Sequence, residues 1–228
     1  ASGGRLAGII SSRGEFLKVE TDESGRVLCV SVNQDGEEVK LVRYRYDDRG
    51  DMVETLDALD VSKHFVYSGG HLLVQLTNQG GMSFHWEYEG KGENARCVHT
   101  WGDGGVMEYF IRYGKGYTHI RNGENAETEY YYGEDKLIYK IVDANGGITR
   151  HQYNSFQELE VTVNPEGYTR KTAYNEFGQP LRITDENGED TFLDYDGNRN
   201  LVSLYTPGGK RLSWDYDGLD RVVSRTTP

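Results

Sequence analysis

The sequence is poor in several features that would point to a particular class of protein. Its two cysteines, Cys29 and Cys97, are too few for a disulfide scaffold, and their spacing gives no reason to pair them. No run of about 18 apolar residues occurs, so no segment is long enough to cross a membrane as a helix. The opening residues ASGGRLAGII lack a basic segment followed by a long apolar one. We therefore expect no signal peptide for the general secretory route in this segment.

Basic residues are also in the minority. Lys and Arg number 25 against 37 Asp and Glu, which gives a formal net charge of −12 in 228 residues. A field of this sign repels phosphate backbones, so the composition argues against a nucleic-acid partner. No window of 12 or more residues carries a convincing helical stripe. Glycine and tyrosine are abundant, at 29 and 17 residues. Glycine suits turns with positive φ and tyrosine suits half-buried strands, so the composition predicts a β-protein with many tight turns.

Tyrosine recurs at a nearly constant spacing. Six of the eight intervals in the series are 21 residues long, and the other two, of 25 and 19 residues, flank Tyr113. Glycine recurs fourteen residues after tyrosine in the same frame, so these residues define the repeat. The repeat-defining tyrosines are Tyr46, Tyr67, Tyr132, Tyr153, Tyr174, Tyr195 and Tyr216, with Tyr88 and Tyr113 in the irregular part, and the glycines are Gly146, Gly167, Gly188 and Gly209.

Each repeat predicts one β-hairpin. Residues 159–163, 181–184, 201–205 and 210–216 read as strands, and in the last of these Leu212, Trp214 and Tyr216 alternate with polar residues. Such alternation is typical of a strand with one packed and one wet face. Asn187-Gly188 is a tight-turn pair. Because an isolated hairpin is marginally stable, successive hairpins must cover one another in a long antiparallel sheet.

The repeat frame also predicts the organisation of the chain. Residues 1–45 read as one or two degenerate repeats without the leading tyrosine, and residues 46–228 as the repeat array. A longer, irregular unit occupies residues 88–132. The last repeat begins at Tyr216 and is incomplete at Pro228, so we expect the chain to be part of a longer one.

Few residues have the side-chain type and spacing of a metal-binding or reactive site. Cys97 and His99 are close in sequence, but no second pair accompanies them, whereas a metal site needs three or four converging ligands. The segment 194–200 places oxygen-bearing side chains at alternate positions, like a calcium loop. However, Arg199 stands where the glycine belongs, and Tyr205 replaces the bidentate glutamate. We interpret this segment as a solvated turn, with calcium as the alternative, and predict no metal site and no cofactor.

Two further features have a structural and a binding interpretation. The segment containing Trp101, Asp103 and Gly104 is either an irregular corner of the sheet or a binding loop around Asp103, and glycine-rich irregularities in strands favour the corner. The tyrosine series is either an inter-strand packing ladder or, if it faces outward, a platform for carbohydrate. No catalytic triad spacing, carboxylate pair or phosphate loop is present. We therefore predict no catalytic residue.

Three segments resemble the Rhs, or YD-repeat, family: YDDRGDMVETLDALD at 46–60, YNEFGQPLRITDENG at 174–188 and YDGNRNLVSLYTPGG at 195–209. The resemblance covers roughly residues 20–228. Residues 85–105, HWEYEGKGENARCVHTWGDGG, resemble a segment typical of the bacterial Rhs proteins among type VI secretion effectors. The resemblance implies repeats that wind into a hollow β-shell enclosing a C-terminal toxin domain. The self-cleaving motif of the family is absent from this segment, so no catalytic residue is carried over.

The expected fold is therefore all-β, a curved antiparallel sheet of hairpin repeats that forms part of a hollow shell. The expected function is non-enzymatic: a shell segment that shields the C-terminal toxin domain of the same polypeptide, with secretion or chaperone proteins as further partners. The alternative is a cell-surface module that binds glycans or a partner protein. The resemblance implies synthesis in the bacterial cytoplasm, followed by secretion or surface exposure. Exposed sheet edges are expected to favour self-association.

Overall fold

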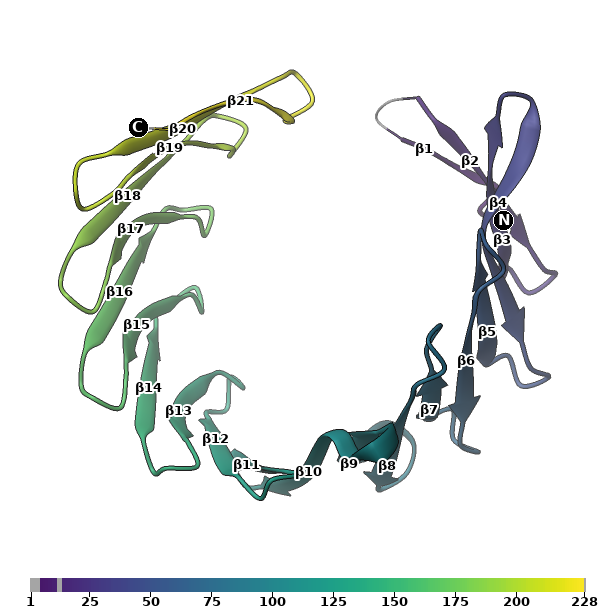
Figure 1. The fold of residues 1–228 in the computed structure, drawn as a ribbon. Coiled ribbons are helices and arrows are strands. Elements are labelled where there is room, and N and C mark those ends of the chain that lie inside the picture. The colour runs from purple at the N-terminus through teal and green to yellow at the C-terminus, as the bar shows by residue number, and fades with distance from the viewer. Residues whose placement is uncertain (1–4, 12–13, 228) are drawn as a thin grey trace. The chain divides into compact units, whose positions relative to one another are not determined.

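The computed structural model describes residues 5–11 and 14–227 and is all-β, as predicted (Figure 1). It divides into two compact units, residues 1–111 with 122–124, and residues 112–121 with 125–228. The only helical elements among the described residues are two 3₁₀ turns, η1 (Gly92–Asn94) and η2 (Asp103–Gly105), and neither is long enough to cross a membrane.

The first unit is an antiparallel meander in which each strand pairs with the next along the chain. Bulges recur in its strand ladder beside the repeat tyrosines, as between Arg45 and Tyr46. The boundary between the two units falls within its last strand. The strands are β1 (Gly8–Ile10), β2 (Phe16–Thr21), β3 (Val27–Gln34), β4 (Glu37–Tyr46), β5 (Met52–Asp57), β6 (Ser62–Tyr67), β7 (Leu73–Thr77), β8 (Ser83–Glu89), β9 (Arg96–Gly102) and β10 (Val106–Gly114).

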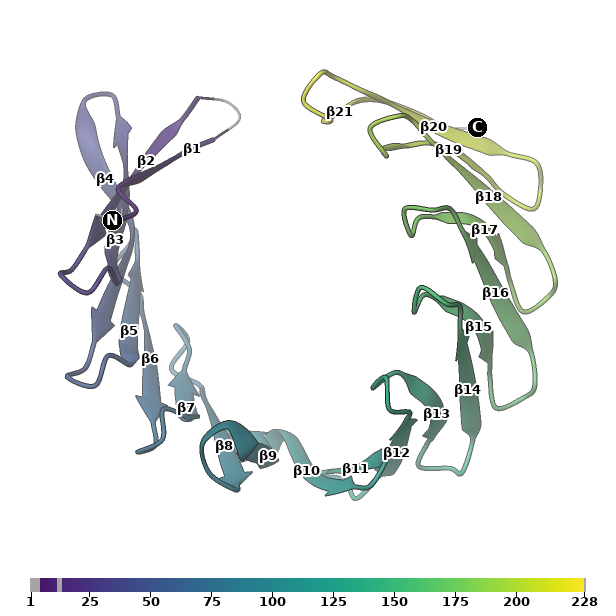
Figure 2. The ribbon, with the colours of Figure 1, turned by 180° about the vertical axis from the view of Figure 1, so that it is seen from behind.

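The second unit is a more regular meander of the same kind. Its loops form two rows, one at each end of the strands (Figures 1 and 2). The predicted strands 159–163 and 201–205 are confirmed as β15 and β19. The strands are β11 (Tyr117–Asn122), β12 (Glu127–Tyr132), β13 (Ile138–Val142), β14 (Ile148–Tyr153), β15 (Leu159–Val163), β16 (Thr169–Tyr174), β17 (Pro180–Thr184), β18 (Asp190–Tyr195), β19 (Leu201–Tyr205), β20 (Arg211–Tyr216) and β21 (Val222–Thr226).

The two faces of the second unit differ in composition. Side chains alternate along a strand, and the cross-strand register places residues one and three positions before each repeat tyrosine on one side. We call this side the charged face; it carries Glu129, Lys140, Arg150, Lys171, Arg182, Asp194 and Arg211. The opposite side, the tyrosine face, carries Tyr130, Tyr132, Tyr153, Thr172, Tyr174, Leu193, Tyr195, Trp214 and Tyr216.

The predicted fully packed face is not found within either unit. Among the described residues, the only buried hydrophobic side chains are Val19, Cys29 and Leu193. Sequential pairing arranges the strands of each unit as a single layer, so most apolar side chains stay half-exposed. The alternation of polar and apolar residues predicted the strands correctly. It did not specify what packs against their apolar side. Each unit is therefore held together mainly by its strand ladder and by polar contacts between repeats.

Candidate functional site: inter-repeat contacts and the irregular unit

The repeat tyrosines join neighbouring repeats through their hydroxyl groups. Tyr174 donates to the carbonyl oxygen of Leu159 at 2.8 Å, and Leu159 is the residue that pairs with the preceding repeat tyrosine across a bulge. The Tyr174 hydroxyl therefore satisfies a carbonyl at the bulge of the repeat before it. The same bond, fifteen residues back, is made by Tyr88, Tyr132, Tyr153, Tyr195 and Tyr216, while Tyr46 donates to Val27, nineteen residues back.

Burial acts on several of these phenols. It raises the pKa of Tyr46, Tyr88 and Tyr195 above the usual value of 10.0, because the charged phenolate loses solvation. The protonated hydroxyl, which is the form able to donate, is therefore favoured. The geometry gives these tyrosines a hydrogen-bonding role between repeats, while the packing ladder stays a prediction.

Both turns of each repeat have the same construction. At the corner after Tyr174, the Asn175 side-chain oxygen accepts from the backbone N–H groups of Phe177 and Gln179, and Gly178 bonds back to the Asn175 carbonyl. At the other turn, Asp185 accepts from Asn187 and Glu189 in the same pattern. The residue three positions after the Asp or Asn takes positive φ, at 81° in Gly146, 88° in Gly167 and 83° in Gly188, and Gly209, three positions after Thr206, has φ of 74°.

The same turn is present in the N-terminal segment without a leading tyrosine. Asp22 accepts from the backbone N–H groups of Ser24 and Arg26, and Gly25 has φ of 83°. Thr21 pairs with Val27 across a bulge, the position that tyrosine occupies elsewhere. The carbonyl of Val27 in turn accepts from Tyr46. This segment therefore follows the repeat architecture, while the boundary at residue 45 stays a prediction.

Side chains at neighbouring corners also contact one another, which the sequence interpretation did not anticipate. Asp51, buried apart from 8% of its surface, lies 2.7 Å from Nδ1 of His71 in the next corner. Asn200 donates to Asp220 at 2.8 Å in the same way, across the same interval of 20 residues. The sequence did contain a signal for these contacts, because side chains of successive corners must lie about one 21-residue repeat apart. These contacts link corners laterally without forming a reactive centre.

The irregular unit contains a stack of rings on strands β8, β9 and β10. His85 stacks on Trp101, Trp101 on His99, and His99 on Phe110, with ring centroids 5.1, 4.2 and 4.2 Å apart. The register explains the stack, because His85 lies opposite Trp101 and Phe110 opposite His99. Sequence reasoning paired His99 only with Cys97, whereas the sheet places His99 on one face with His85.

Carboxylates surround this ring stack. The Nδ1 and Nε2 atoms of His99 lie 3.3 Å from Glu87 and 3.0 Å from Glu108. Asp103 accepts from the Ser83 N–H at 2.8 Å and contacts His85 at 3.2 Å. These two bonds lower the pKa of Asp103, with the backbone bond the larger cause. Carboxylates only accept hydrogen bonds, so in each contact with His99 the ring nitrogen is the donor.

The predicted corner at Trp101, Asp103 and Gly104 lies at the end of β9. Asp103 and Gly104 belong to the 3₁₀ turn η2 between β9 and β10, and Gly104 has φ of 73°. Met107, just beyond, also has positive φ, at 52°. A hollow of about 600 Å³ lies beside this turn, lined by Gly104, Gly105, Met107, Glu108, Tyr109, Asn122, Gly123 and Glu124.

This region offers little for catalysis or metal binding. The two carboxylates bonded to His99 approach different ring nitrogens, so they do not converge on one point. Across residues 5–11 and 14–227, no three His, Cys, Asp or Glu side chains form a group that could hold a metal ion. Burial raises the pKa of the Cys97 thiol, which disfavours the nucleophilic thiolate.

The calcium-like segment forms an ordinary corner. Asp196 accepts from the backbone N–H groups of Asn198 and Asn200, and the Asn side chains donate to Asp220. Asp194 lies on the preceding strand and Arg199 takes φ of 72°. The Asp196 oxygens therefore accept turn bonds, and Asn198 and Asn200 bond to the next corner through their side-chain nitrogens.

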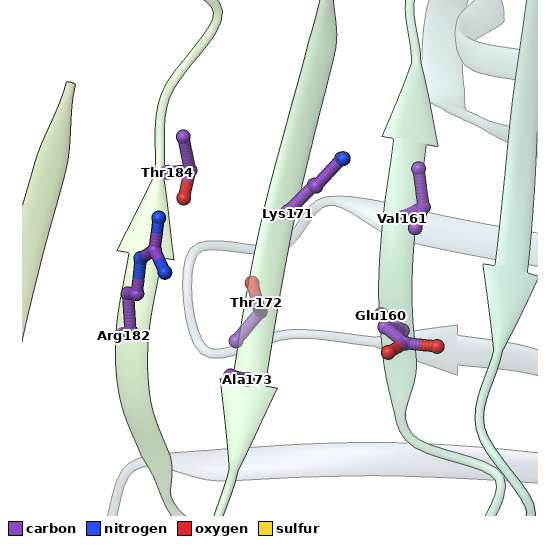
Figure 3. A pocket seen from close by; sticks show the side chains of 7 residues that line it. All are labelled: Glu160, Val161, Lys171, Thr172, Ala173, Arg182 and Thr184. Carbon is purple, nitrogen blue, oxygen red and sulfur yellow. The ribbon is translucent and has the colours of Figure 1, made fainter. Parts of the chain in front are cut away.

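A second, shallow hollow of about 380 Å³ lies over strands β15, β16 and β17 (Figure 3). Lys171 and Arg182 stand at it together with Glu160, Val161, Thr172, Ala173 and Thr184. Arg182 is held by Asp190 at 2.9 Å, and Thr184 donates to the same carboxylate at 2.6 Å. The hollow is open and combines the two cations with the Glu160 carboxylate and two threonine hydroxyl groups.

These contacts define a class: a tandem β-hairpin repeat protein whose characteristic residues bond one repeat to the next. Residues 174–211 and 195–228 each match the RHS Repeat family. Through these repeats the chain resembles the Rhs, or YD-repeat, family and the repeat shells of polymorphic toxins.

Curated relatives include large toxins. The chain is 25% identical over 161 residues to the protein named "Probable deoxyribonuclease RhsB" of Dickeya dadantii (strain 3937), covering 70% of this chain and 11% of that protein. It is 27% identical over 150 residues to "Toxin protein Tse5" of Pseudomonas aeruginosa, covering 64% of this chain and 11% of that protein. The chain therefore spans about a tenth of the length of these relatives.

Solved structures share the fold. The crystal structure of TcdB2-TccC3-TEV gives a TM-score of 0.50 at 11% identity and covers 98% of this chain and 17% of that one. The structure of TcdB2-TccC3 without the hypervariable C-terminal region gives a TM-score of 0.50 at 11% identity, covering 94% and 15%. At this identity the likeness concerns the fold alone.

Proposed function

We propose that this chain is a wall segment of an Rhs-type toxin shell, which surrounds and shields a C-terminal toxin domain of the same polypeptide. One observation carries the proposal most: the repeated tyrosine bonds and turn caps serve to propagate a single-layered sheet from repeat to repeat. In this proposal, the function of such a sheet is to enclose another part of the polypeptide. The toxin names of the relatives and the short share of their length that this chain spans support this function.

In this function the segment itself is not enzymatic. Its conspicuous residues are committed to bonds within and between repeats, and the histidine of the irregular unit is held between two carboxylates. The division into residues 1–45, the array from 46 and the irregular unit at 88–132 is part of the same proposal, with the ring stack bracing the longer unit. Synthesis in the bacterial cytoplasm, delivery by type VI secretion to competing cells, and secretion or chaperone partners are further parts of this proposal, taken from the family resemblance of the sequence.

Protease protection of the full-length gene product tests this function. The product is treated with a broad-specificity protease while folded and again after mild denaturation, and C-terminal fragments are followed by intact mass. Shielding predicts that sequence C-terminal to the repeats survives in the folded protein and is cut once the repeats unfold. Equal cutting rates in both states would exclude a shielding wall.

The alternative is a surface module that binds glycans or a partner protein. Exposed aromatic side chains favour it, since Phe156, Tyr168 and Phe177 lie at loop positions with at least half of their surface accessible. Saturable binding of the isolated chain on a glycan array, lost in Phe156→Ser and Phe177→Ser variants, would support this function. Absence of glycan binding, together with protease protection of the C-terminal sequence, would leave the shell wall as the supported function.

A further inference from the structure

A stripe of four cations crosses the charged face of the second unit, although the chain as a whole is strongly acidic. Lys140 lies on β13, Arg150 on β14, Lys171 on β16 and Arg182 on β17. The register links them: Lys140 is directly opposite Arg150, and Lys171 and Arg182 follow diagonally across β15, β16 and β17. We call these four residues the cation stripe.

The arrangement is costly to the isolated sheet. Like charges directly opposite one another on an antiparallel pair destabilise it, and Lys140 and Arg150 are such a pair. Among the described residues, Arg150 and Lys171 pair with no carboxylate, whereas Arg182 is bonded to Asp190. Lys140 lies 3.5 Å from the centroid of the Tyr131 ring. Two exposed cations of the stripe are thus left without a counter-charge.

The surroundings of the stripe are apolar as well as basic. On the charged face, Val142, Ile148, Val161 and Val163 lie between or beside the cations. The shallow hollow of Figure 3 is lined by Lys171 and Arg182 on adjacent strands, together with Glu160, Val161 and Ala173. Such a surface suits a ligand that alternates carboxylates with apolar side chains.

The size of the stripe matches a short extended peptide. Five adjacent strands about 4.8 Å apart span roughly 19 Å, which equals about six residues of extended chain. Glu129 and Asp190 border the stripe on its two sides. They limit the positive field to this length, so a long phosphate backbone would meet repulsion beyond it.

We propose that the cation stripe is a docking surface for an acidic, extended polypeptide segment. Its carboxylates would pair with Arg150 and Lys171 and offset the repulsion between Lys140 and Arg150, while its apolar side chains would cover Val161 and Ala173. The docking surface follows from the charges of this face and does not depend on whether the repeats enclose a toxin domain.

The test is binding of a labelled peptide to the chain. The probe is a fluorescein-labelled peptide of alternating glutamate and valine, flanked by Gly-Ser for solubility, and fluorescence anisotropy is measured at low and at high salt. We expect saturable binding at low salt that weakens as salt rises, because the contacts are between exposed charges. The same peptide with glutamine in place of glutamate should not bind.

Matched variants locate the surface. The double variant Arg150→Gln/Lys171→Gln should bind the peptide about tenfold more weakly, through loss of both unpaired cations. Arg170→Gln is the control, because Arg170 neighbours Lys171 on β16 but lies on the tyrosine face; it should change binding by less than about twofold. In the absence of peptide, Arg150→Gln should not lower the melting temperature, because it removes a like-charge pair.

Several outcomes would overturn the proposal. These are no peptide binding at low salt, equal binding by the double variant and the parent, or equal loss in the Arg170→Gln control. Tighter binding of a single-stranded 12-mer DNA than of the glutamate peptide would make the stripe a nucleic-acid surface and also overturn it. Backbone amide shifts confined to β13–β17 on peptide addition would support it independently of the variants.

Discussion

At the scale of single residues, the repeat tyrosine and the Asp or Asn that follows it have bonding roles. The tyrosine hydroxyl closes a bulge in the preceding repeat, and the Asp or Asn oxygen accepts two backbone N–H groups of its own corner. Both bonds satisfy backbone groups that the strand ladder leaves open. Where this bond forms, tyrosine has a bonding group that phenylalanine lacks.

Replacement of one tyrosine hydroxyl tests this role. Tyr174→Phe keeps the ring but leaves the Leu159 carbonyl without its donor, so we expect a loss of about 1 kcal/mol in the free energy of unfolding. Urea denaturation followed by circular dichroism measures it. Tyr205→Phe is the control, because Tyr205 stands outside the repeat position, where its ring neighbours Arg211. Equal effects of the two variants would contradict the bonding role.

Left-handed backbone at corner positions gives a second test. Gln157 has φ of 66°, in a place that glycine occupies in other repeats, such as Gly178 with φ of 76°. Left-handed conformation costs a non-glycine residue roughly 1 kcal/mol, so Gln157→Gly should stabilise the protein by about that amount. Gly188→Ala, at φ of 83°, should destabilise it by a similar amount. Thermal melts of both variants check the opposite signs.

At the scale of elements, the turn carboxylates make the sheet sensitive to acid. The Arg221 side chain, followed by the backbone N–H groups of Leu219 and Arg221, lowers the pKa of Asp217 from 3.8 to about 2. Backbone bonds likewise lower the pKa of Asp22, Asp57 and Asp196. A carboxylate whose pKa is lower in the folded state adds stability above its unfolded value and loses it as pH falls.

We therefore expect stability to be retained above about pH 4 and to fall between about pH 4 and pH 2. Chemical denaturation at a series of pH values measures the slope. Asp217→Asn should reduce the slope while keeping the corner, because Asn154 and Asn175 form the same turn with an amide oxygen. A slope in this range that does not change in the Asn variant would contradict the assignment to Asp217.

His99 contributes to the irregular unit both through ring stacking and through its bonds to two carboxylates. His99→Phe keeps a ring between Trp101 and Phe110 but removes the bonds to Glu87 and Glu108. We expect destabilisation by about 1–3 kcal/mol, since two carboxylates lose their partner. Adding Glu87→Gln and Glu108→Gln should restore much of the loss. If His99→Phe is neutral in urea denaturation, stacking alone holds the unit.

Much of this fold could be predicted from the sequence, because the repeat encodes it locally. The tyrosine period, the turn glycines and the alternation in residues 210–216 specify strands and turns residue by residue. The ring stack could not be predicted, because bulges in β8–β9 and β9–β10 set which side chains meet. The single-layered arrangement could not be predicted either, because alternation identifies the apolar side of a strand but not the element that covers it.

At the scale of the whole molecule, each unit is one layer of strands bonded in sequence order, with few buried side chains among the residues described. A layer of this kind gains stability from each added repeat and from closure of its edges. The proposed function therefore lies in what a wall built of such repeats would separate.

Electron cryo-microscopy of the full-length gene product tests the central claim most directly. The account predicts that these repeats lie in the wall of a closed β-shell, with density for a further part of the same polypeptide inside. Repeats that stand open to solvent on both faces, or a gene product with no polypeptide beyond residue 228, would contradict it.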